Sequence, residues 1–268
     1  MEYNVRAIAL SRTQAGERDV LVTYFTHERG RMQAMVRGTT KTVSSLRPAA
    51  QPLNEGDALI VERRGADLLT EWVPVTSFPG VTRRLRSLCL AAYLLRFTRE
   101  LTNLRQPEPA LYNLLKITLS ALQNNEFYDI MKLTFEWGYL RISGLAFDLS
   151  QCSECGRKRQ AKDRAALDIP GGGVYCPRCA PGAKAAGTMV LCLDAVELGN
   201  MIDEVISRVS GDVLAGEEQT TSYLRNLQRL HQHNGKTGGV AAAQFQSAVS
   251  RFIQFHLNES APSWHARV

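Results

Sequence analysis

The sequence predicts an α+β protein in which a five-stranded barrel precedes a helical domain with an inserted four-cysteine segment. Three observations support this order. Short apolar segments with strand-like alternation fill the first 80 residues, helical periodicity follows, and two Cys-x-x-Cys pairs interrupt it. The expected domains are a barrel over 1–80, a helical domain over 81–150 and 188–268, and the cysteine insertion over 151–187.

The barrel is predicted from five short segments that turn residues separate. Gly16, Gly30, Gly56 and Gly65 mark the turns between them. Five short strands in so few residues fit a small closed barrel, because closure removes exposed sheet edges, and an OB-type barrel is the natural candidate. The expected strands cover 3–10, 20–26, 31–37, 57–63 and 68–75.

The helical domain is predicted from apolar residues that recur every three or four positions. In the first expected helix this spacing is shown by Leu85, Leu88, Cys89, Ala92, Leu95 and Leu101. Pro107 and Pro109 end that helix. Further helices are expected over 110–123, 127–143, 194–208, 220–231 and 240–257.

Four cysteines predict a zinc knuckle. Cys152, Cys155, Cys176 and Cys179 form two Cys-x-x-Cys pairs with 20 residues between them, the spacing of a four-cysteine zinc site. Four thiolates leave no open position on the metal, so we expect one structural Zn²⁺. Two disulfides or four unrelated thiols are the alternatives, but the N-terminus carries no visible secretory signal, and a reducing compartment favours metal.

Positive charge is concentrated in two segments of a chain with a formal net charge of +6. Residues 1–86 hold 13 cationic and 9 acidic residues, and residues 152–187 hold 7 and 3. The segment 87–151 is balanced, and 188–268 is acidic. Two cationic segments are compatible with two contact surfaces for a polyanion, and solvated Lys and Arg side chains explain the composition equally well.

Candidate phosphate contacts lie in both cationic segments. From Arg29 to Arg47 there is no acidic residue, and Ser and Thr adjoin the cations. Hydroxyl groups share phosphate contact with Arg and Lys, and such a track predicts weak sequence preference with strong salt dependence. The predicted DNA-contact residues are Arg29, Arg31, Arg37, Lys41 and Arg47, then Arg83, Arg84 and Arg86, and in the cysteine segment Arg157, Lys158 and Arg159.

Sequence signatures of catalysis are missing. There is no Gly-x-x-x-x-Gly-Lys-Ser/Thr loop, no His-Glu-x-x-His and no zinc-deaminase signature. We therefore expect no enzyme and no catalytic residue. The alternatives are a nuclease with a structural zinc, which a Mg²⁺-dependent cleavage assay would reveal, and a scaffold whose basic segments bind acidic protein tails.

The order of these features resembles the bacterial RecO family of DNA-repair proteins. The likeness spans most of the chain and is most specific over residues 5–60. It is weaker at the four cysteines, which some members of the family lack. The residues that carry it are Ala7-Ile-Ala-Leu10, Gly16-Glu-Arg-Asp-Val-Leu-Val-Thr23, Phe25-Thr-His-Glu-Arg-Gly-Arg31, Val36-Arg-Gly38, Ser44-Ser-Leu46 and Gln51-Pro-Leu53.

The resemblance implies an OB-fold domain, a helical bundle and a zinc-binding region. It also implies binding of single- and double-stranded DNA, annealing of complementary strands and partnership with RecR. With RecR, such proteins help to load the RecA recombinase onto strands coated by single-stranded-DNA-binding protein (SSB), whose acidic C-terminal tail docks on the helical domain. Arg96, Arg99 and Lys116 are candidates for the cation that meets the carboxylate of this tail.

The expected location is cytoplasmic and nucleoid-associated, with no membrane partner. The longest strongly apolar run extends from about Leu88 to Leu95. A membrane span needs roughly 20 apolar residues, so this run is too short.

Overall fold

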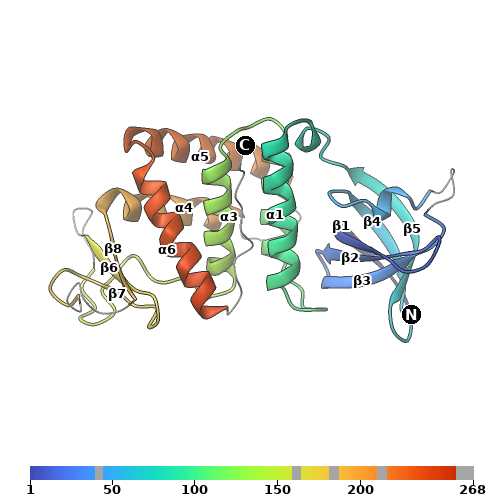
Figure 1. The fold of residues 1–268 in the computed structure, drawn as a ribbon, viewed down its shortest axis with the longest axis horizontal. Helices are drawn as coiled ribbons and strands as arrows, with labels where there is room; N and C mark the ends of the chain where they lie inside the picture. Colours follow the sequence, from blue (N-terminus) through green and yellow to red (C-terminus); the bar gives the residue numbers. More distant parts are fainter. Residues whose placement is uncertain (40–44, 159–163, 181–186, 210–215, 258–268) are drawn as a thin grey trace. The chain divides into compact units, whose positions relative to one another are not determined.

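The computed structural model describes residues 1–39, 45–158, 164–180, 187–209 and 216–257. Its described residues divide into two compact units, unit 1 up to Glu126 and unit 2 from Phe127 onward (Figure 1). The predicted α+β class is confirmed, because unit 1 contains a five-stranded barrel and unit 2 is helical with the cysteine segment inserted. The predicted domain boundary near residue 80 stays a prediction. None of the helices among the described residues has the length and apolar character to cross a membrane.

The barrel is a closed ring of five strands in the order β1-β2-β3-β5-β4. Neighbouring strands pair antiparallel, except that β3 and β5 run parallel. The strand β1 pairs with β4 from Glu2 to Ile8 and with β2 from Ala7 to Gln14, and a register shift between Ala9 and Ser11 interrupts its pairing with β2. All five predicted strands are present: β1 (Glu2–Gln14), β2 (Val20–Thr26), β3 (Gly30–Val36), β4 (Glu55–Val61) and β5 (Asp67–Thr76).

Aromatic residues fill the barrel interior rather than its surface. The rings of Tyr24 and Trp72 lie 6.0 Å apart, centroid to centroid, and both side chains are buried. The Tyr24 hydroxyl donates a hydrogen bond of 2.8 Å to the carbonyl of Ala49, in the 3-10 turn η1 (Pro48–Ala50). These rings are therefore core residues and not platforms for stacked bases.

Two helices, α1 (Leu85–Leu101) and α2 (Pro109–Leu122), belong to unit 1 and contact the barrel. A short 3-10 turn, η2 (Val81–Arg83), precedes α1. The fully buried Phe25 of β2 packs against Tyr112 of α2, with ring centroids 6.0 Å apart. The helices thus cover part of the outer barrel surface.

The apolar residues whose spacing predicted α1 do not all lie on its buried face. Leu85 and Leu88 are 64% and 38% exposed, and Ala92 is exposed too, whereas Leu94 and Phe97 are fully buried. Because α1 is apolar around much of its circumference, the spacing identified the helix but not the rotation that faces the larger side chains inward.

The connection between α1 and α2 extends the sheet of the barrel. Leu104 forms a parallel bridge with Arg31, and the N–H of Arg105 donates to the Arg31 carbonyl over 2.8 Å. Gly30 permits this approach, because its φ is +66° and a Cβ there would collide with the carbonyl oxygen of Gln106. The connection therefore occupies the first half of the β3 edge, which β5 does not reach.

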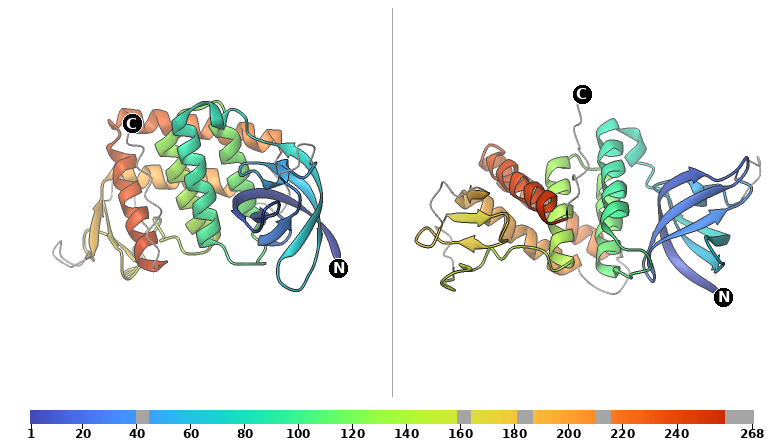
Figure 2. Two further views of the ribbon diagram at one scale, coloured as in Figure 1. Left: turned by 45° about the vertical axis from the view of Figure 1, so that its right-hand side comes forward. Right: turned by 60° about the horizontal axis from the view of Figure 1, so that its bottom comes forward.

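Unit 2 is built around four helices, which Figure 2 shows from two further directions. Trp137 lies at its core, with its ring centroid 4.7 Å from that of Phe147 and 5.1 Å from that of Phe245. The helix α4 contacts the other three. The helices are α3 (Tyr128–Ile142), α4 (Leu193–Val209), α5 (Glu217–Lys236) and α6 (Val240–His256).

The helix α5 is longer than the predicted 220–231 and extends beyond it at both ends. Asn234 explains the extension at the C-terminal end. Its carbonyl accepts the N–H of Gly239 over 3.0 Å, and its side-chain oxygen accepts the N–H of Ala242 over 3.1 Å. These bonds join the end of α5 to the start of α6, so tertiary contact overrides the polar sequence.

Candidate metal centre and nucleic-acid interface

The four cysteines predicted to bind metal converge in unit 2. Their Sγ atoms all lie within 4.8 Å of one another. A tetrahedral ion with metal–sulfur bonds of 2.3 Å separates its sulfurs by about 3.8 Å, so the donor set fits one four-coordinate ion. The described residues hold all four as free thiols: Cys152 and Cys176 are buried, Cys179 is half-buried and Cys155 is exposed.

Each pair of cysteines is shaped by a tight backbone turn. The N–H of Gly156 donates to the Cys152 carbonyl over 2.9 Å, and the N–H of Cys179 donates to the Cys176 carbonyl over 3.0 Å. Gly156 has a φ of +67°, which residues with a Cβ rarely adopt. Both turns direct the two sulfurs of a pair to the same side of the chain.

A small antiparallel sheet, absent from the sequence prediction, supports the second pair. Its strands β6 (Ala165–Asp168), β7 (Val174–Tyr175) and β8 (Thr188–Leu191) have the order β7-β6-β8, and β7 leads directly into Cys176. Ser153 joins the two turns, because its N–H donates to the Val174 carbonyl and its hydroxyl accepts the Val174 N–H. Strands of two to four residues are too short to show alternation.

Backbone N–H groups favour the thiolate form of the two buried cysteines. The N–H groups of Cys155 and Cys176 lower the pKa of Cys152 to about 6. The N–H of Cys179 likewise lowers the pKa of Cys176. The pKa of Cys179 is raised to about 12, chiefly because its thiol is hydrogen-bonded to those of Cys155 and Cys176. Sulfurs this close repel one another as anions, so a cation is needed to ionise all four.

Predicted phosphate contacts of the barrel do not form one continuous track. Arg37 and Arg47 are exposed, whereas Lys41 lies outside the described residues. Arg29 and Arg31, at the other end of β3, are half-buried. β3 has seven residues, and a rise of about 3.3 Å per residue separates its two ends by roughly 20 Å. The barrel therefore carries cations at two distinct ends.

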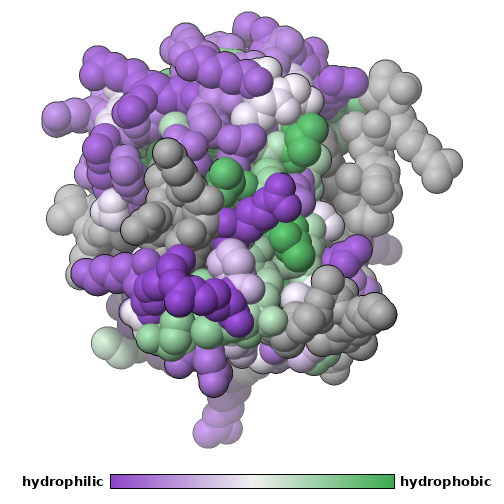
Figure 3. Space-filling model, turned by 90° about the vertical axis from the view of Figure 1, so that its left-hand side faces the viewer, coloured by the Kyte–Doolittle hydropathy of each residue, from purple (hydrophilic) through white to green (hydrophobic). Residues whose placement is uncertain are grey.

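The remaining predicted contacts lie near α1 and near the cysteines. Arg83, Arg84 and Arg86 are exposed, and Arg84 pairs with Glu126 over 3.3 Å. In the cysteine segment Arg157 and Lys158 are exposed, and Arg159 falls outside the described residues. Figure 3 shows one face of the molecule, on which hydrophilic side chains predominate and hydrophobic ones lie between them.

A buried carboxylate, Glu55, has partners that sequence reasoning missed. It accepts the Tyr112 hydroxyl over 3.0 Å and pairs with the ammonium of Lys116 over 3.1 Å, while Arg6 lies 3.9 Å away. Burial, followed by the charge of Glu55, raises the pKa of Tyr112. Lys116 therefore links α2 to Glu55 of β4 by an ion pair, and its side chain is only 17% exposed.

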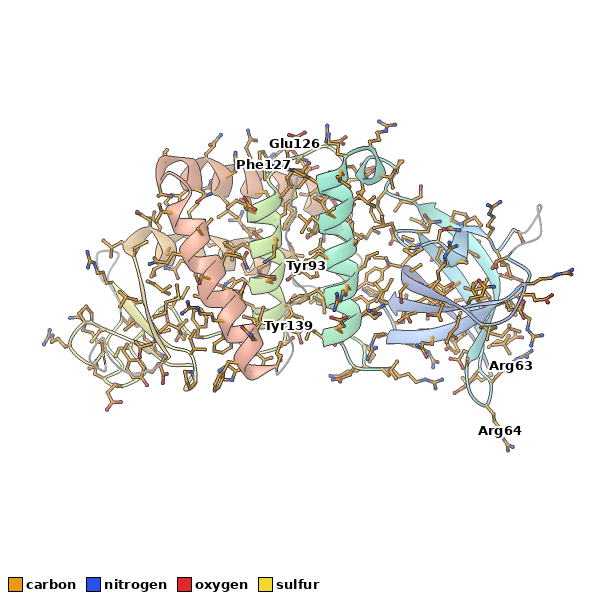
Figure 4. All side chains as sticks on the ribbon, viewed as in Figure 1. Arg63, Arg64, Tyr93, Glu126, Phe127 and Tyr139 are labelled. Atoms are coloured by element: carbon orange, nitrogen blue, oxygen red, sulfur yellow. The ribbon has the colours of Figure 1, made fainter. Side chains whose placement is uncertain are left out.

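Sequence reasoning also missed Arg63 and Arg64. Both are exposed in the turn between β4 and β5, where Figure 4 shows them pointing away from the barrel. Two adjacent arginines in a turn beside a glycine are the signal that could have identified them.

The fold and the cysteine cluster together define a class of two-part α+β protein, with a closed five-stranded barrel and a helical unit that carries a metal-type donor set. Residues 1–78 match the family model described as Recombination protein O N terminal, and residues 83–191 match Recombination protein O C terminal. The chain belongs to the RecO family of DNA repair and recombination proteins.

Two relatives illustrate the extent of the similarity. The DNA repair protein RecO of Anaeromyxobacter sp. (strain K) is 32% identical over 193 residues, which cover 69% of this chain and 76% of that protein. The DNA repair protein RecO of Geobacter metallireducens is 27% identical over 216 residues, which cover 78% and 88%. The similarity thus spans both units.

Proposed function

We propose that this protein binds single- and double-stranded DNA without cleaving it and anneals complementary strands. The observation that carries the proposal is the set of exposed arginines at the barrel ends, in a chain of the RecO family. Arg37 and Arg47 are exposed, and neither forms an ion pair with any described residue. Free guanidinium groups bind phosphate through several donors at once.

Annealing by this mechanism needs no covalent chemistry. Two strands repel each other through their phosphates, and a protein with separate cationic surfaces screens that repulsion and raises the local strand concentration. Arg37 and Arg47 would supply one surface, and Arg157 and Lys158 the other. Base pairing then supplies the free energy of annealing.

We also infer that the protein acts with RecR to help load RecA on SSB-coated DNA, and that it is cytoplasmic and nucleoid-associated. Family membership supports this inference. For the SSB tail, Arg96 and Arg99 are better candidates than Lys116, which Glu55 engages. Both arginines contact Glu100, at 2.7 Å and 3.3 Å, so an incoming carboxylate would compete with Glu100 for them.

The ion proposed for the cysteine cluster is one structural Zn²⁺. Cys152, Cys155, Cys176 and Cys179 would hold it, and the four closely spaced sulfurs match its preferred ligands and coordination number. Bound zinc would neutralise the thiolates and cross-link the two turns. A closed four-thiolate sphere leaves no position at which water is activated.

Salt-titrated DNA binding tests the proposed function. We expect the Arg37→Ala/Arg47→Ala variant to reduce the slope of log K against log salt by about 1.4–1.8, since each lost phosphate contact removes about 0.7–0.9. The matched control is Arg225→Ala/Arg229→Ala, which removes two exposed arginines from α5 and should leave the slope unchanged. Equal slopes for both variants would contradict the proposal.

Intact recovery of labelled strands in the presence of Mg²⁺ excludes the nuclease alternative. The scaffold alternative is tested by letting an acidic peptide, of the same net charge as the labelled strand, compete with that strand for the protein. If the peptide binds and the strand does not, the cationic surfaces serve protein partners instead of DNA.

A further inference from the structure

A small pocket lies at the end of the barrel where β1 begins and where the α1–α2 connection passes. Its volume is about 80 Å³. The residues that line it all belong to unit 1 and are Tyr3, Arg29, Met32, Arg105 and Pro107. Two of these five side chains are guanidinium groups.

The two arginines of the pocket differ in how their charge is balanced. Arg105 lies 3.1 Å from the buried Asp67 and 3.3 Å from Glu62, so its charge is offset. Arg29 stacks on Tyr3, with its guanidinium carbon 3.7 Å from the ring centroid. In the part of the chain that the structure describes, no carboxylate pairs with Arg29. Arg29 therefore presents an unneutralised charge in a fixed orientation.

The turn between β4 and β5 adds two cations beside this pocket. Arg63 and Arg64 are exposed, point away from the barrel, and have no carboxylate partner among the described residues (Figure 4). The N–H of Arg63 donates to Asp67 over 3.3 Å, and the Tyr3 hydroxyl donates to the same carboxylate over 3.0 Å. Asp67 thus contacts both the turn and Tyr3, which lines the pocket.

We propose that this end of the barrel binds the backbone phosphates of a nucleic-acid strand, with one phosphate held by Arg29 in the pocket. This inference rests on the proposed DNA-binding function. A water-sized group needs about 10–15 Å³ of pocket volume, so a pocket of about 80 Å³ holds several of them and has room for a phosphate group. Arg63 and Arg64 would contact neighbouring phosphates of the same strand.

Charge and geometry both favour phosphate over other ligands. Of the four arginines at positions 29, 63, 64 and 105, only Arg105 forms an ion pair with a described residue, and its partners are Glu62 and Asp67. A planar guanidinium donates two parallel hydrogen bonds to a phosphate, and its stacking on Tyr3 fixes the plane in which these donors lie.

Salt titration of strand binding with the full-length protein tests the proposal. The variants are Arg29→Gln and Arg63→Ala/Arg64→Ala, which spare the Arg105–Asp67 pair. We expect Arg29→Gln to reduce the salt slope by about 0.7–0.9 and the double variant by about 1.4–1.8. The control Arg225→Ala/Arg229→Ala should keep the wild-type slope, and Arg29→Lys should restore the slope that Arg29→Gln loses, since it retains the charge.

Inorganic phosphate provides a second readout and separates a strand phosphate from a free anion. At equal ionic strength, phosphate should displace the oligonucleotide from the wild type more strongly than chloride does, and Arg29→Gln should lose this excess. An excess that persists in Arg29→Gln overturns the proposal. So does Arg29-dependent phosphate competition without any change in the salt slope, because the pocket would then bind a free anion only.

Strand binding by the wild type and by the pocket variants distinguishes a wrong pocket assignment from a wrong proposed function. If the wild type binds strands and the pocket variants keep its slope and affinity, the pocket assignment is wrong and DNA binding stands. If the wild type does not bind strands at all, the proposed function itself is wrong. Circular dichroism and thermal unfolding of each variant establish that the barrel is folded in every comparison.

Discussion

The guanidinium of Arg105 lies 3.1 Å from the carboxylate of Asp67, which is 1% exposed. This pair joins the α1–α2 connection to the first residue of β5, where the Tyr3 hydroxyl also donates to Asp67. A buried carboxylate needs such donors, because burial without them carries a large desolvation penalty. Asp67 therefore contributes both to the stability of the barrel and to the position of Arg105, which lines the pocket.

Replacing Arg105 should destabilise unit 1. We expect Arg105→Ala to lower the free energy of unfolding by about 1–2 kcal/mol, less than for a fully buried pair, because the Arg105 side chain is 54% exposed and solvent screens it. Urea unfolding of the purified protein measures the change. Arg225→Ala, on an exposed face of α5, should stay within about 0.5 kcal/mol of the wild type. If Arg105→Ala and Arg225→Ala changed the free energy of unfolding equally, the Arg105–Asp67 pair would not stabilise unit 1.

Lys116→Met should cost more than Arg105→Ala. It leaves the fully buried Glu55 without its 3.1 Å cation, and removing one partner of a buried pair costs about 3–5 kcal/mol. The same urea experiment measures it, with Arg96→Ala as the control because Arg96 is 57% exposed. A Lys116→Met protein as stable as the wild type would show that the Glu55 site tolerates the loss through Tyr112 and Arg6.

Zinc removal should loosen the cysteine segment and spare the barrel. Chelation, or Cys176→Ser, should abolish the single bound Zn²⁺ in metal analysis, and hydrogen exchange should increase at β6 and β7. Strands β1 to β5 should keep their protection, because they belong to unit 1. The control is Cys89→Ser, a half-buried cysteine of α1 that should leave the metal content at one ion. Stoichiometric zinc in Cys176→Ser would refute the ligand assignment.

Zinc affinity should fall more steeply with decreasing pH below about pH 6. Backbone N–H groups lower the pKa of Cys152 to about 6, so its thiolate is present above that pH and is lost as the pH falls through it. Protons then compete with the metal, and affinity decreases. A zinc-sensitive dye should report little release at pH 7 and progressive release below about pH 6. If zinc release already increased steeply as the pH fell through the ordinary pKa of a thiol, about 9, the backbone N–H groups would not lower the pKa of Cys152 as described.

Much of the fold was predictable because its signals are local. The alternation of Val20–Thr26 gave β2 with its observed bounds, and the spacing of the cysteines predicted a cluster that the structure forms. The pairings that organise unit 1 were not predictable in the same way. Asp67 and Arg105 are 38 positions apart, and only the register of β5 and the path of the α1–α2 connection bring them together.

The candidate nucleic-acid surface was predicted with less detail than the metal centre. Charge counting selected Arg29 and Arg37 as parts of one track, but β3 places them at opposite ends of a seven-residue strand. Composition does not specify such a separation. It also did not single out Arg63 and Arg64, since they stand next to Glu62 and look neutralised in sequence.

Equilibrium binding of a labelled single strand by the zinc-loaded wild type, measured across a range of salt concentrations, tests the central claim most directly. We predict that log K falls linearly with log salt, with a slope of several negative units that corresponds to several phosphate contacts, and that the strand is recovered intact. No binding even at low salt, or binding that is insensitive to salt, would contradict the account.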